Sequence, residues 1–299
     1  PATHSDDYIP KKVSFTSTYT ELGARELVVL VRVANYEDPY RGGILHSVRF
    51  GSQAAIDTER WYSVGFQLIA FVVLLLHGLY ACIIYLMNRH EKALLIFCLI
   101  SVVTSISIVS DHDNLLTLWL SLDFAWSFKI RLLSYMWLAF LIVYFFRSFT
   151  SLTQGRKWFA VYSAALVAYS VFLCAAPAPI AYFTYHYRVF SVLYLFPFAW
   201  LVYLIGKLFF MKKSDEDAVF LQLAGAAVLS SAIWGAVASY VTVPDLYYPA
   251  DIIAAIIGFS TYWFKKYFRK SHENIRLNRQ LQEADRLKNQ FLANPSHEL

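Results

Sequence analysis

The chain alternates between long apolar segments and short polar loops from Trp61 to Phe268. An α-helix of about twenty apolar residues crosses the hydrocarbon core of a bilayer. Helices are the expected spanning form, because lipid offers no hydrogen-bond partner to an open backbone. The pattern predicts a bundle of seven membrane-spanning helices, at residues 62–87, 93–110, 130–149, 159–176, 189–210, 219–241 and 249–268.

The stretch between the second and third predicted spans, residues 115–128, is apolar and rich in Trp but is interrupted by Asp123. It is too short for an eighth span, so we expect it to lie at the membrane interface, where Trp rings accumulate. The composition fits a membrane protein, with 58% hydrophobic and 18% aromatic residues. The chain is therefore expected to be a mainly α-helical membrane protein.

Basic residues in the loops indicate the orientation. If the first residue lies outside, the inner segments hold twelve Lys or Arg and the outer segments hold four. Basic residues accumulate on the cytoplasmic side, so the N-terminus is expected outside and the C-terminus inside. These loops also account for the net charge of +5, which requires no nucleic-acid partner. The inner set is Arg89, Lys92, Arg147, Arg156, Lys157, Lys207, Lys212, Lys213, Lys265, Lys266, Arg269 and Lys270, and the outer set is Arg60, Lys129, Arg131 and Arg188.

The segment before the first span, residues 1–57, has the pattern of β-strands. Residues 26–34 (ELVVLVRVA) form a β-branched run, and residues 44–50 are a second strand candidate. The NYEDPYRGG sequence between them has the residues of a turn. So few strands do not complete a sandwich, and we expect this segment to be the end of a β-domain in a longer protein.

Few polar side chains fall inside the predicted spans. His77 is one of them, and it is either a functional ionisable group or a neutral side chain bonded to a neighbour. The outer residues 111–113 (DHD) lack the spacing of a metal site on one helix face, so we expect a solvated loop and no metal. Asp123, Lys129 and Arg131 either line a ligand pocket or extend from the interface toward water.

Three other classes of seven-helix or transport protein fit poorly. The last predicted span contains no Lys to which retinal could attach, since Lys265 and Lys266 lie at its cytoplasmic end. The D-R-Y and N-P-x-x-Y motifs of eukaryotic G-protein-coupled receptors are absent. Pro197 is the only proline well inside a predicted span, which argues against the broken helices of many transporters.

The composition changes abruptly after Phe268. Residues 269–299 contain six Lys or Arg and four Asp or Glu, with apolar residues at spacings of three and four. This spacing predicts a helix that continues the seventh span and forms a two-stranded coiled coil, hence a homodimer. An amphipathic helix on anionic membrane lipid is the alternative. The apolar positions are Leu277, Leu281, Ala284, Leu287 and Phe291.

Residues 31–52 (VRVANYEDPYRGGILHSVRFGS) resemble the closing strands of an extracytoplasmic jelly-roll sensor domain. That domain occurs in seven-transmembrane receptors with diverse intracellular signalling modules. The matching features are Asn35 with Tyr36, the Gly42-Gly43 pair and Gly51. The resemblance implies a β-sandwich that binds a carbohydrate-like or other small ligand. The alternative is another β-sandwich tail ahead of a membrane anchor.

Residues 286–299 (RLKNQFLANPSHEL) resemble the phosphoacceptor box of bacterial sensor histidine kinases, with F-L-A-N and S-H-E-L at the family's spacing. The resemblance implies that His297 accepts phosphate from ATP and that Glu298 is the neighbouring acid/base. Pro295 departs from the family pattern, which has Met, Ile or Thr at this position. Its ring would press on the carbonyl group of Phe291 and kink the helix beside His297.

These resemblances together imply a bacterial inner-membrane sensor histidine kinase of a two-component phosphorelay. Its parts would be a periplasmic β-sandwich end (1–57), a seven-helix domain (62–268) and a cytoplasmic signalling helix (269–299). The phosphate of His297 would pass to the receiver domain of a response regulator. ATP and Mg2+ would bind in a kinase domain beyond residue 299, so no cofactor is expected in this chain.

Two alternatives stay open at this point. One is a binding or transport protein whose last helix serves only for dimerisation or membrane contact. The other is the same receptor block with a different output module, such as a cyclase.

Overall fold

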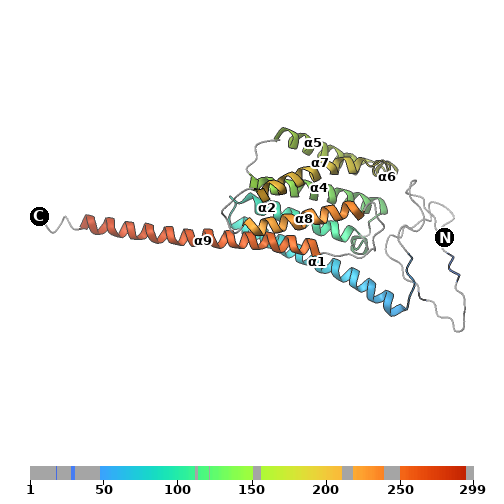
Figure 1. Ribbon diagram of the computed structural model, residues 1–299, viewed down its shortest axis with the longest axis horizontal. Coiled ribbons are helices and arrows are strands. Elements are labelled where there is room, and N and C mark those ends of the chain that lie inside the picture. The colour runs from blue at the N-terminus through green and yellow to red at the C-terminus, as the bar shows by residue number, and fades with distance from the viewer. Residues whose placement is uncertain are drawn as a thin grey trace.

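The computed structural model describes residues 18, 28–30, 48–111, 114–120, 122–150, 156–210, 218–238 and 250–293. Within these ranges the regular structure consists of helices, and no strand is present (Figure 1). Most of the predicted β-domain lies outside the described residues. His297 and Glu298 lie outside them as well.

The described helices follow the predicted spans closely. Seven of them have at least 19 residues, and each of the seven contains most of one predicted span. The helices are α1 (Gln53–Met87), α2 (Lys92–Ser110), α3 (Leu116–Trp119), α4 (Phe124–Thr150), α5 (Arg156–Ala175), α6 (Ala178–His186), α7 (Val189–Phe210), α8 (Ala218–Ala238) and α9 (Ala250–Ala293).

Five helices are long and apolar enough to cross a membrane, namely α1, α2, α4, α5 and α7. The apolar part of α8 is shorter, at Val219–Gly235. The apolar start of α9 soon reaches Lys265 and Lys266. Membrane crossing by α8 and by the first part of α9 stays a prediction.

The polar connections show why these helices begin and end where they do. The hydroxyl of Ser52 accepts a hydrogen bond from the backbone N–H of Ala55 at 3.3 Å and caps the start of α1. Asn114, between α2 and α3, has a φ angle of 49°, in the left-handed region that Asn tolerates better than most residues. Residues 115–128, expected at the interface, contain the short α3 and the first residues of α4. The short helix α6 was not predicted.

The centre of the bundle is a cluster of phenylalanines from three helices. Phe97 of α2, Phe145 of α4 and Phe259 of α9 are all buried. The ring centroid of Phe259 lies 5.8 Å from that of Phe97 and 4.9 Å from that of Phe145, in edge-to-face arrangements. The first part of α9 is therefore packed into the same core as α2 and α4.

Helix α9 packs closely against α8 at a glycine. A Cβ atom added at Gly258 would lie 2.9 Å from the Cβ of Ala224 and 3.0 Å from the carbonyl oxygen of Phe220. Small residues of this kind let two helix backbones approach within a membrane bundle. Gly258 thus fixes the distance between α9 and α8.

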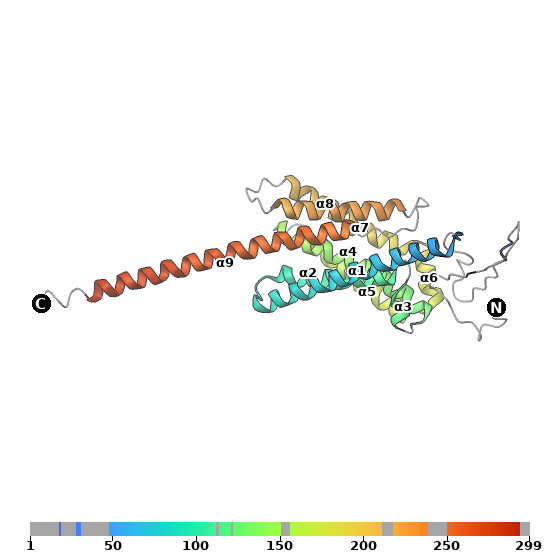
Figure 2. The same ribbon diagram turned by 90° about the horizontal axis from the view of Figure 1, so that it is seen from below.

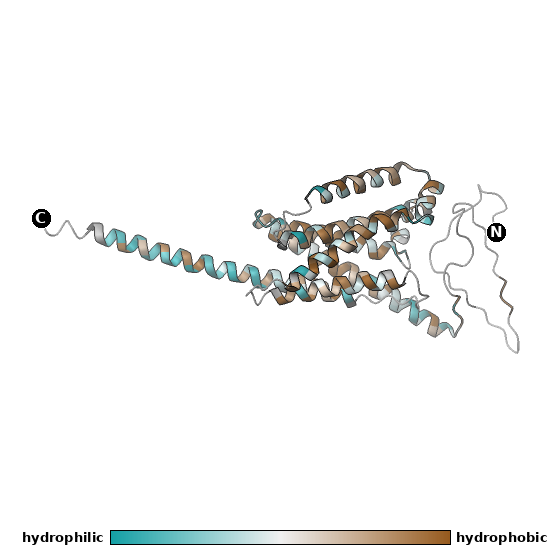
Figure 3. Cartoon of the chain, turned by 45° about the horizontal axis from the view of Figure 1, so that its top comes forward, coloured by the Kyte–Doolittle hydropathy of each residue, from teal (hydrophilic) through white to brown (hydrophobic). Residues whose placement is uncertain are grey.

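The long helix α9 leaves the bundle at the end opposite to the one where α1 begins (Figures 1 and 2). It contains 44 residues, and the part outside the bundle is largely hydrophilic (Figure 3). Leu277, Leu281 and Leu287 of the predicted coiled-coil face are 60–66% exposed. One continuous helix therefore joins the apolar core to the polar segment that precedes His297.

Candidate functional site

Helix α2 has an acidic residue immediately beyond each end. Glu91 precedes Lys92, and Asp111 follows Ser110. α2 packs against α1 and α4 and is the most buried of the five long apolar helices. Its length of 19 residues separates the two carboxylates by about 30 Å. Each carboxylate binds basic or hydroxyl groups of another helix.

The carboxylate of Glu91 holds two lysines of α9. Lys270 Nζ lies 3.2 Å from Glu91 Oε1, and Lys266 Nζ lies 3.4 Å from Glu91 Oε2. The two lysines are four residues apart and therefore share one face of α9. We call Glu91, Lys266 and Lys270 the α9 junction. It ties the turn between α1 and α2 to the point where α9 leaves the bundle.

Electrostatics keep the α9 junction charged. Burial alone would raise the pKa of Glu91, but the ammonium groups of Lys266 and Lys270 outweigh burial and lower that pKa below its ordinary value. Lys266 also lies 4.6 Å from the ring centroid of the buried Trp263, in a cation–π contact. The ion pairs are therefore present at neutral pH.

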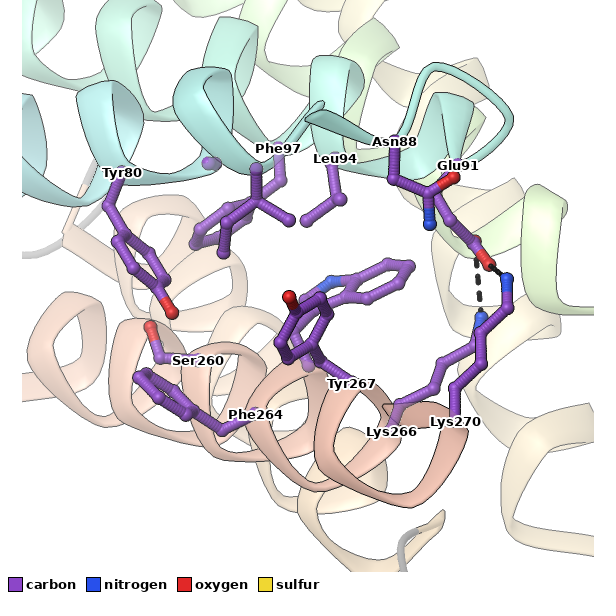
Figure 4. A pocket seen from close by; sticks show the side chains of 13 residues that line it. Tyr80, Asn88, Glu91, Leu94, Phe97, Ser260, Phe264, Lys266, Tyr267 and Lys270 are labelled. Carbon is purple, nitrogen blue, oxygen red and sulfur yellow. Dashed lines mark hydrogen bonds and ion pairs between the residues drawn. The ribbon is translucent and has the colours of Figure 1, made fainter. Parts of the chain in front are cut away.

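A cavity of about 40 Å³ adjoins the α9 junction (Figure 4). Its wall comes from α1, from the turn after α1, from the start of α2 and from α9. Tyr80 and Phe264 stack at one end with ring centroids 5.5 Å apart, and the two lysines stand at the other end. The junction thus borders a partly open space between α1 and α9.

The carboxylate of Asp111 forms a second polar cluster, which we call the outer cluster. The hydroxyl of Tyr135 lies 2.5 Å from Asp111 Oδ2, and Arg131 Nη1 lies 3.6 Å from Asp111 Oδ1. Both partners belong to α4. Asp111 is therefore part of a packed ion pair, whereas the sequence interpretation placed it in a solvated loop. Residues 112 and 113 lie outside the described residues.

Lys129 of α4 is buried, with 5% of its surface exposed. Its Nζ atom donates to the carbonyl oxygens of Ala176 at 2.6 Å and Cys174 at 3.4 Å. These carbonyls lie at the end of α5, where the helix dipole favours a cation. α4 begins at Phe124, six residues before the predicted third span. The carbonyl groups at the end of α5 allow this added part of the helix to contain a buried lysine.

Of the other polar residues singled out in the sequence, Asp123 is exposed and precedes the first residue of α4. The His77 ring Nδ1 lies 2.8 Å from the carbonyl oxygen of Val73, one turn earlier in α1. This contact fits the interpretation of His77 as a side chain bonded to a neighbouring group. In the part of the chain that the structure describes, no group of three or more His, Cys, Asp or Glu side chains is placed to hold a metal ion.

The geometry agrees with one family comparison. The sequence model described as 7TM diverse intracellular signalling matches residues 63–264, about two thirds of the chain. The chain belongs to this family. Searches among curated proteins and among solved structures found no match. Family membership identifies the bundle as the seven-transmembrane domain of a multi-pass membrane receptor in signalling.

The family match ends just before the α9 junction on the α9 side. Residue 264 is the last matched position, whereas Lys266 and Lys270 follow it. Glu91 lies inside the matched region. The junction therefore connects the family's membrane domain to the segment that follows. Sequence reasoning counted both lysines as loop charges and passed over Glu91, although Glu91 is the only acidic residue in the inner turn 88–92.

Proposed function

We propose that this chain is the receptor part of a sensor histidine kinase, which controls phosphorylation of His297. The observation that carries the proposal is the continuity of α9. This helix starts in the phenylalanine core of the 7TM domain and extends to Ala293, four residues before His297. The S-H-E-L motif supplies the chemical part of the proposal.

In the proposed reaction, a ring nitrogen of neutral His297 attacks the γ-phosphorus of ATP in line. The new N–P bond forms as the bond from the γ-phosphorus to its bridging oxygen breaks, and ADP leaves. The carboxylate of Glu298 takes the proton that the ring loses. The proposal assigns ATP and Mg2+ to a kinase domain that follows in the natural protein, and the acceptor of the next transfer is an Asp of a response regulator.

The two polar clusters support a physical route for the signal. An extracytoplasmic or membrane signal that moves α4 acts on Asp111 through Tyr135 and Arg131. Helix α2 is rigid and buried, so such a shift also moves Glu91 at its other end. Glu91 then pulls on Lys266 and Lys270 and turns or shifts α9. In this proposal the receptor has one arrangement with the signal and another without it. The two differ in how α9 presents His297 to the kinase domain.

Phosphorylation of the natural full-length protein in membranes with labelled ATP tests the proposal. We expect a phosphate bond that is labile in acid and stable in alkali, as for phosphohistidine. The label should be lost in His297→Gln. The matched control is His272→Gln, which removes an exposed histidine of α9. It should keep the label.

Labelling that persists in His297→Gln would exclude His297 as the acceptor. An unlabelled wild-type protein that still binds ATP would overturn the kinase proposal. The receptor block would then serve another output. A slow reaction in Glu298→Gln, with unchanged ATP binding, would support the proton-accepting role of Glu298.

A further inference from the structure

The cavity beside the α9 junction has a chemical gradient along α9. At the end where α9 leaves the bundle, it is bordered by the ammonium groups of Lys266 and Lys270 (Figure 4). Tyr267 extends into its middle from α9, and the stacked rings of Tyr80 and Phe264 form the opposite end. From Ser260 to Lys270 the helix rises about 15 Å. Positive charge and then aromatic rings thus follow one another over that distance, and the hydroxyls of Tyr80 and Ser260 face each other at the far end.

The basic end of this cavity lies beside two basic stretches of the chain. The stretches 88–92 (NRHEK) and 265–270 (KKYFRK) contain six Lys or Arg and one acidic residue, Glu91. Within the α9 junction, two ammonium groups meet one carboxylate. A net positive charge remains there, and Lys270 is the more accessible ammonium, with 51% of its side chain exposed against 32% for Lys266.

The cavity is also open at the outer surface of the bundle. Tyr80, Phe264 and Tyr267 line it and are 42–46% exposed, so their rings are reachable from outside. Leu94 and Trp263 are buried and form its inner wall. An occupant therefore needs an apolar body beside the rings of α1 and α9. It also needs an anionic group beyond the end of the apolar helix segments.

We propose that this cavity is a binding site for one anionic phospholipid of the adjacent leaflet. The phosphate group contacts Lys270 and then Lys266, in competition with the carboxylate of Glu91. The Tyr267 hydroxyl is placed to donate to an ester carbonyl of the lipid, and an acyl chain lies along Tyr80 and Phe264. The match rests on charge complementarity and on the order of polar and apolar groups, which is that of a phospholipid from headgroup to chain. It holds independently of the role of His297.

Because the phosphate competes with Glu91 for Lys270, lipid binding and the ion pair of Glu91 should change in opposite directions. A bound phosphate draws Lys270 away from Glu91 and weakens the contact between the α1–α2 turn and α9. Removing the carboxylate therefore strengthens lipid binding while it weakens the protein's own ion pair. A surface that attracts lipid only through its overall charge would not distinguish Glu91 from another exposed carboxylate.

Native mass spectrometry of the detergent-purified full chain, titrated with phosphatidylglycerol or phosphatidylcholine, tests the proposal. We expect phosphatidylglycerol to be retained on the order of tenfold better, since each basic residue near a membrane surface contributes appreciably to anionic-lipid binding. Lys266→Gln with Lys270→Gln should abolish the preference. The matched control, Lys157→Gln with Lys207→Gln, removes the same charge from two helix ends on the same side and should keep it.

Two further variants separate a built site from general attraction. Ser260→Phe fills the cavity without changing charge and should lower retention of phosphatidylglycerol, with folding checked by thermal unfolding. Glu91→Gln should raise retention, whereas Glu273→Gln, an exposed carboxylate further along α9, should not.

The proposal is overturned by equal retention of the two lipids, by an equal loss in both double-lysine variants, or by unchanged retention in Ser260→Phe. Soluble glycerol phosphate distinguishes the two sources of a phosphate group. If glycerol phosphate were retained by the protein as well as phosphatidylglycerol is, the proposal would also be overturned. The acyl chain would then contribute nothing to binding.

Discussion

At the scale of single residues, three charged side chains at helix ends meet polar groups of other helices. Glu91, Asp111 and Lys129 all lie within or beside helices whose other residues are mostly apolar, and each one meets a partner from a different helix or from the end of one. Ionisable groups near the bilayer are costly unless they are paired or hydrated. These pairs therefore fix which helices are neighbours, and they do so at the two ends where the bundle meets water.

The stability contributed by Glu91 has a defined pH dependence. The pKa of this residue is lowered from an ordinary value of 4.5 in the folded protein. Its contribution is therefore complete above pH 4.5 and is lost as the pH falls through the lower, folded-state value. Glu91→Gln should reduce the free energy of unfolding at neutral pH by about 0.5–1 kcal/mol, because the pairs are partly exposed.

Thermal unfolding in detergent at neutral pH and at about pH 3.5 measures this effect. The difference between wild type and Glu91→Gln should shrink at the lower pH, since Glu91 in the unfolded chain takes up a proton below its ordinary pKa of 4.5. Glu273→Gln serves as the control and should change little at either pH. A difference for Glu91→Gln that stays constant down to acid pH would show that the carboxylate's charge is not the source of the stability.

Residue type and spacing revealed the helices but not these pairs. Hydropathy predicted the interval of α7 from Val189 to Phe210, because its one charged residue, Lys207, lies in the last turn. The start of α4 at Phe124 was missed, because Lys129 has the appearance of a loop residue until the carbonyls of Ala176 and Cys174 are seen around it. The partner of Glu91 is 175 residues away in sequence, so no local pattern could identify it.

At the scale of elements, α9 combines two roles that are separate in most helices. Its first part is a core helix, with Phe259 against α2 and α4 and Gly258 against α8. Its second part is an exposed polar helix with a row of leucines. The change between them occurs at the α9 junction. A displacement of the core part is therefore carried into the polar part without an intervening loop.

The glycine contact between α8 and α9 predicts that one added methyl group destabilises the bundle at Gly258 but not at a glycine with free space around it. Gly258→Ala should destabilise the bundle by about 1–3 kcal/mol, because the added Cβ has no room against Ala224 and the carbonyl of Phe220. Gly235→Ala is the matched control, since a Cβ there meets nothing within 4 Å. It should be neutral or stabilising, because Ala favours a helix over Gly.

Thermal unfolding of both variants in the same detergent provides the comparison. If Gly258→Ala unfolded at the wild-type temperature, α8 and α9 could not be as close as the structure places them. The variant's effect on phosphorylation is a separate readout. It tests whether the position of α9 matters for output when the protein remains folded.

At the scale of the whole molecule, the bundle is polarised along its long axis. α1 begins at one end, and α9 leaves at the other (Figure 1). The twelve basic residues assigned to the inner side include both lysines of the α9 junction. An odd number of membrane crossings would place the start of α1 and the exit of α9 on opposite sides of the membrane. It would also place the basic α9 junction on the inner side. The five helices that are clearly long and apolar enough, together with α8 and the first part of α9, give the predicted seven.

Reporter fusions in bacterial cells test this topology, with alkaline phosphatase as a reporter that is active only outside the cytoplasm. Fusions after residues 214 and 293 should be inactive, and a fusion after residue 244 should be active. These sites flank α8 and the membrane part of α9, the two helices whose crossing is still a prediction. Equal reporter activity at 214 and 244 would show that α8 does not cross the membrane. The number of crossings would then differ from the predicted seven.

The uninterrupted course of α9 also bears on how such receptors acquire new outputs. From residue 272 to residue 290, every residue of α9 is exposed. The segment from Lys270 to Ala293 spans about 35 Å of helix, so it transmits rotation as well as displacement. Under the proposed function, a recombination event within this segment that preserves the helical phase would attach a different output domain to the same membrane domain. Insertion of whole helical turns would be tolerated, whereas a shift of one or two residues would reverse or abolish control. The membrane domain and its output can therefore evolve as separate units, provided that the helical phase between them is kept.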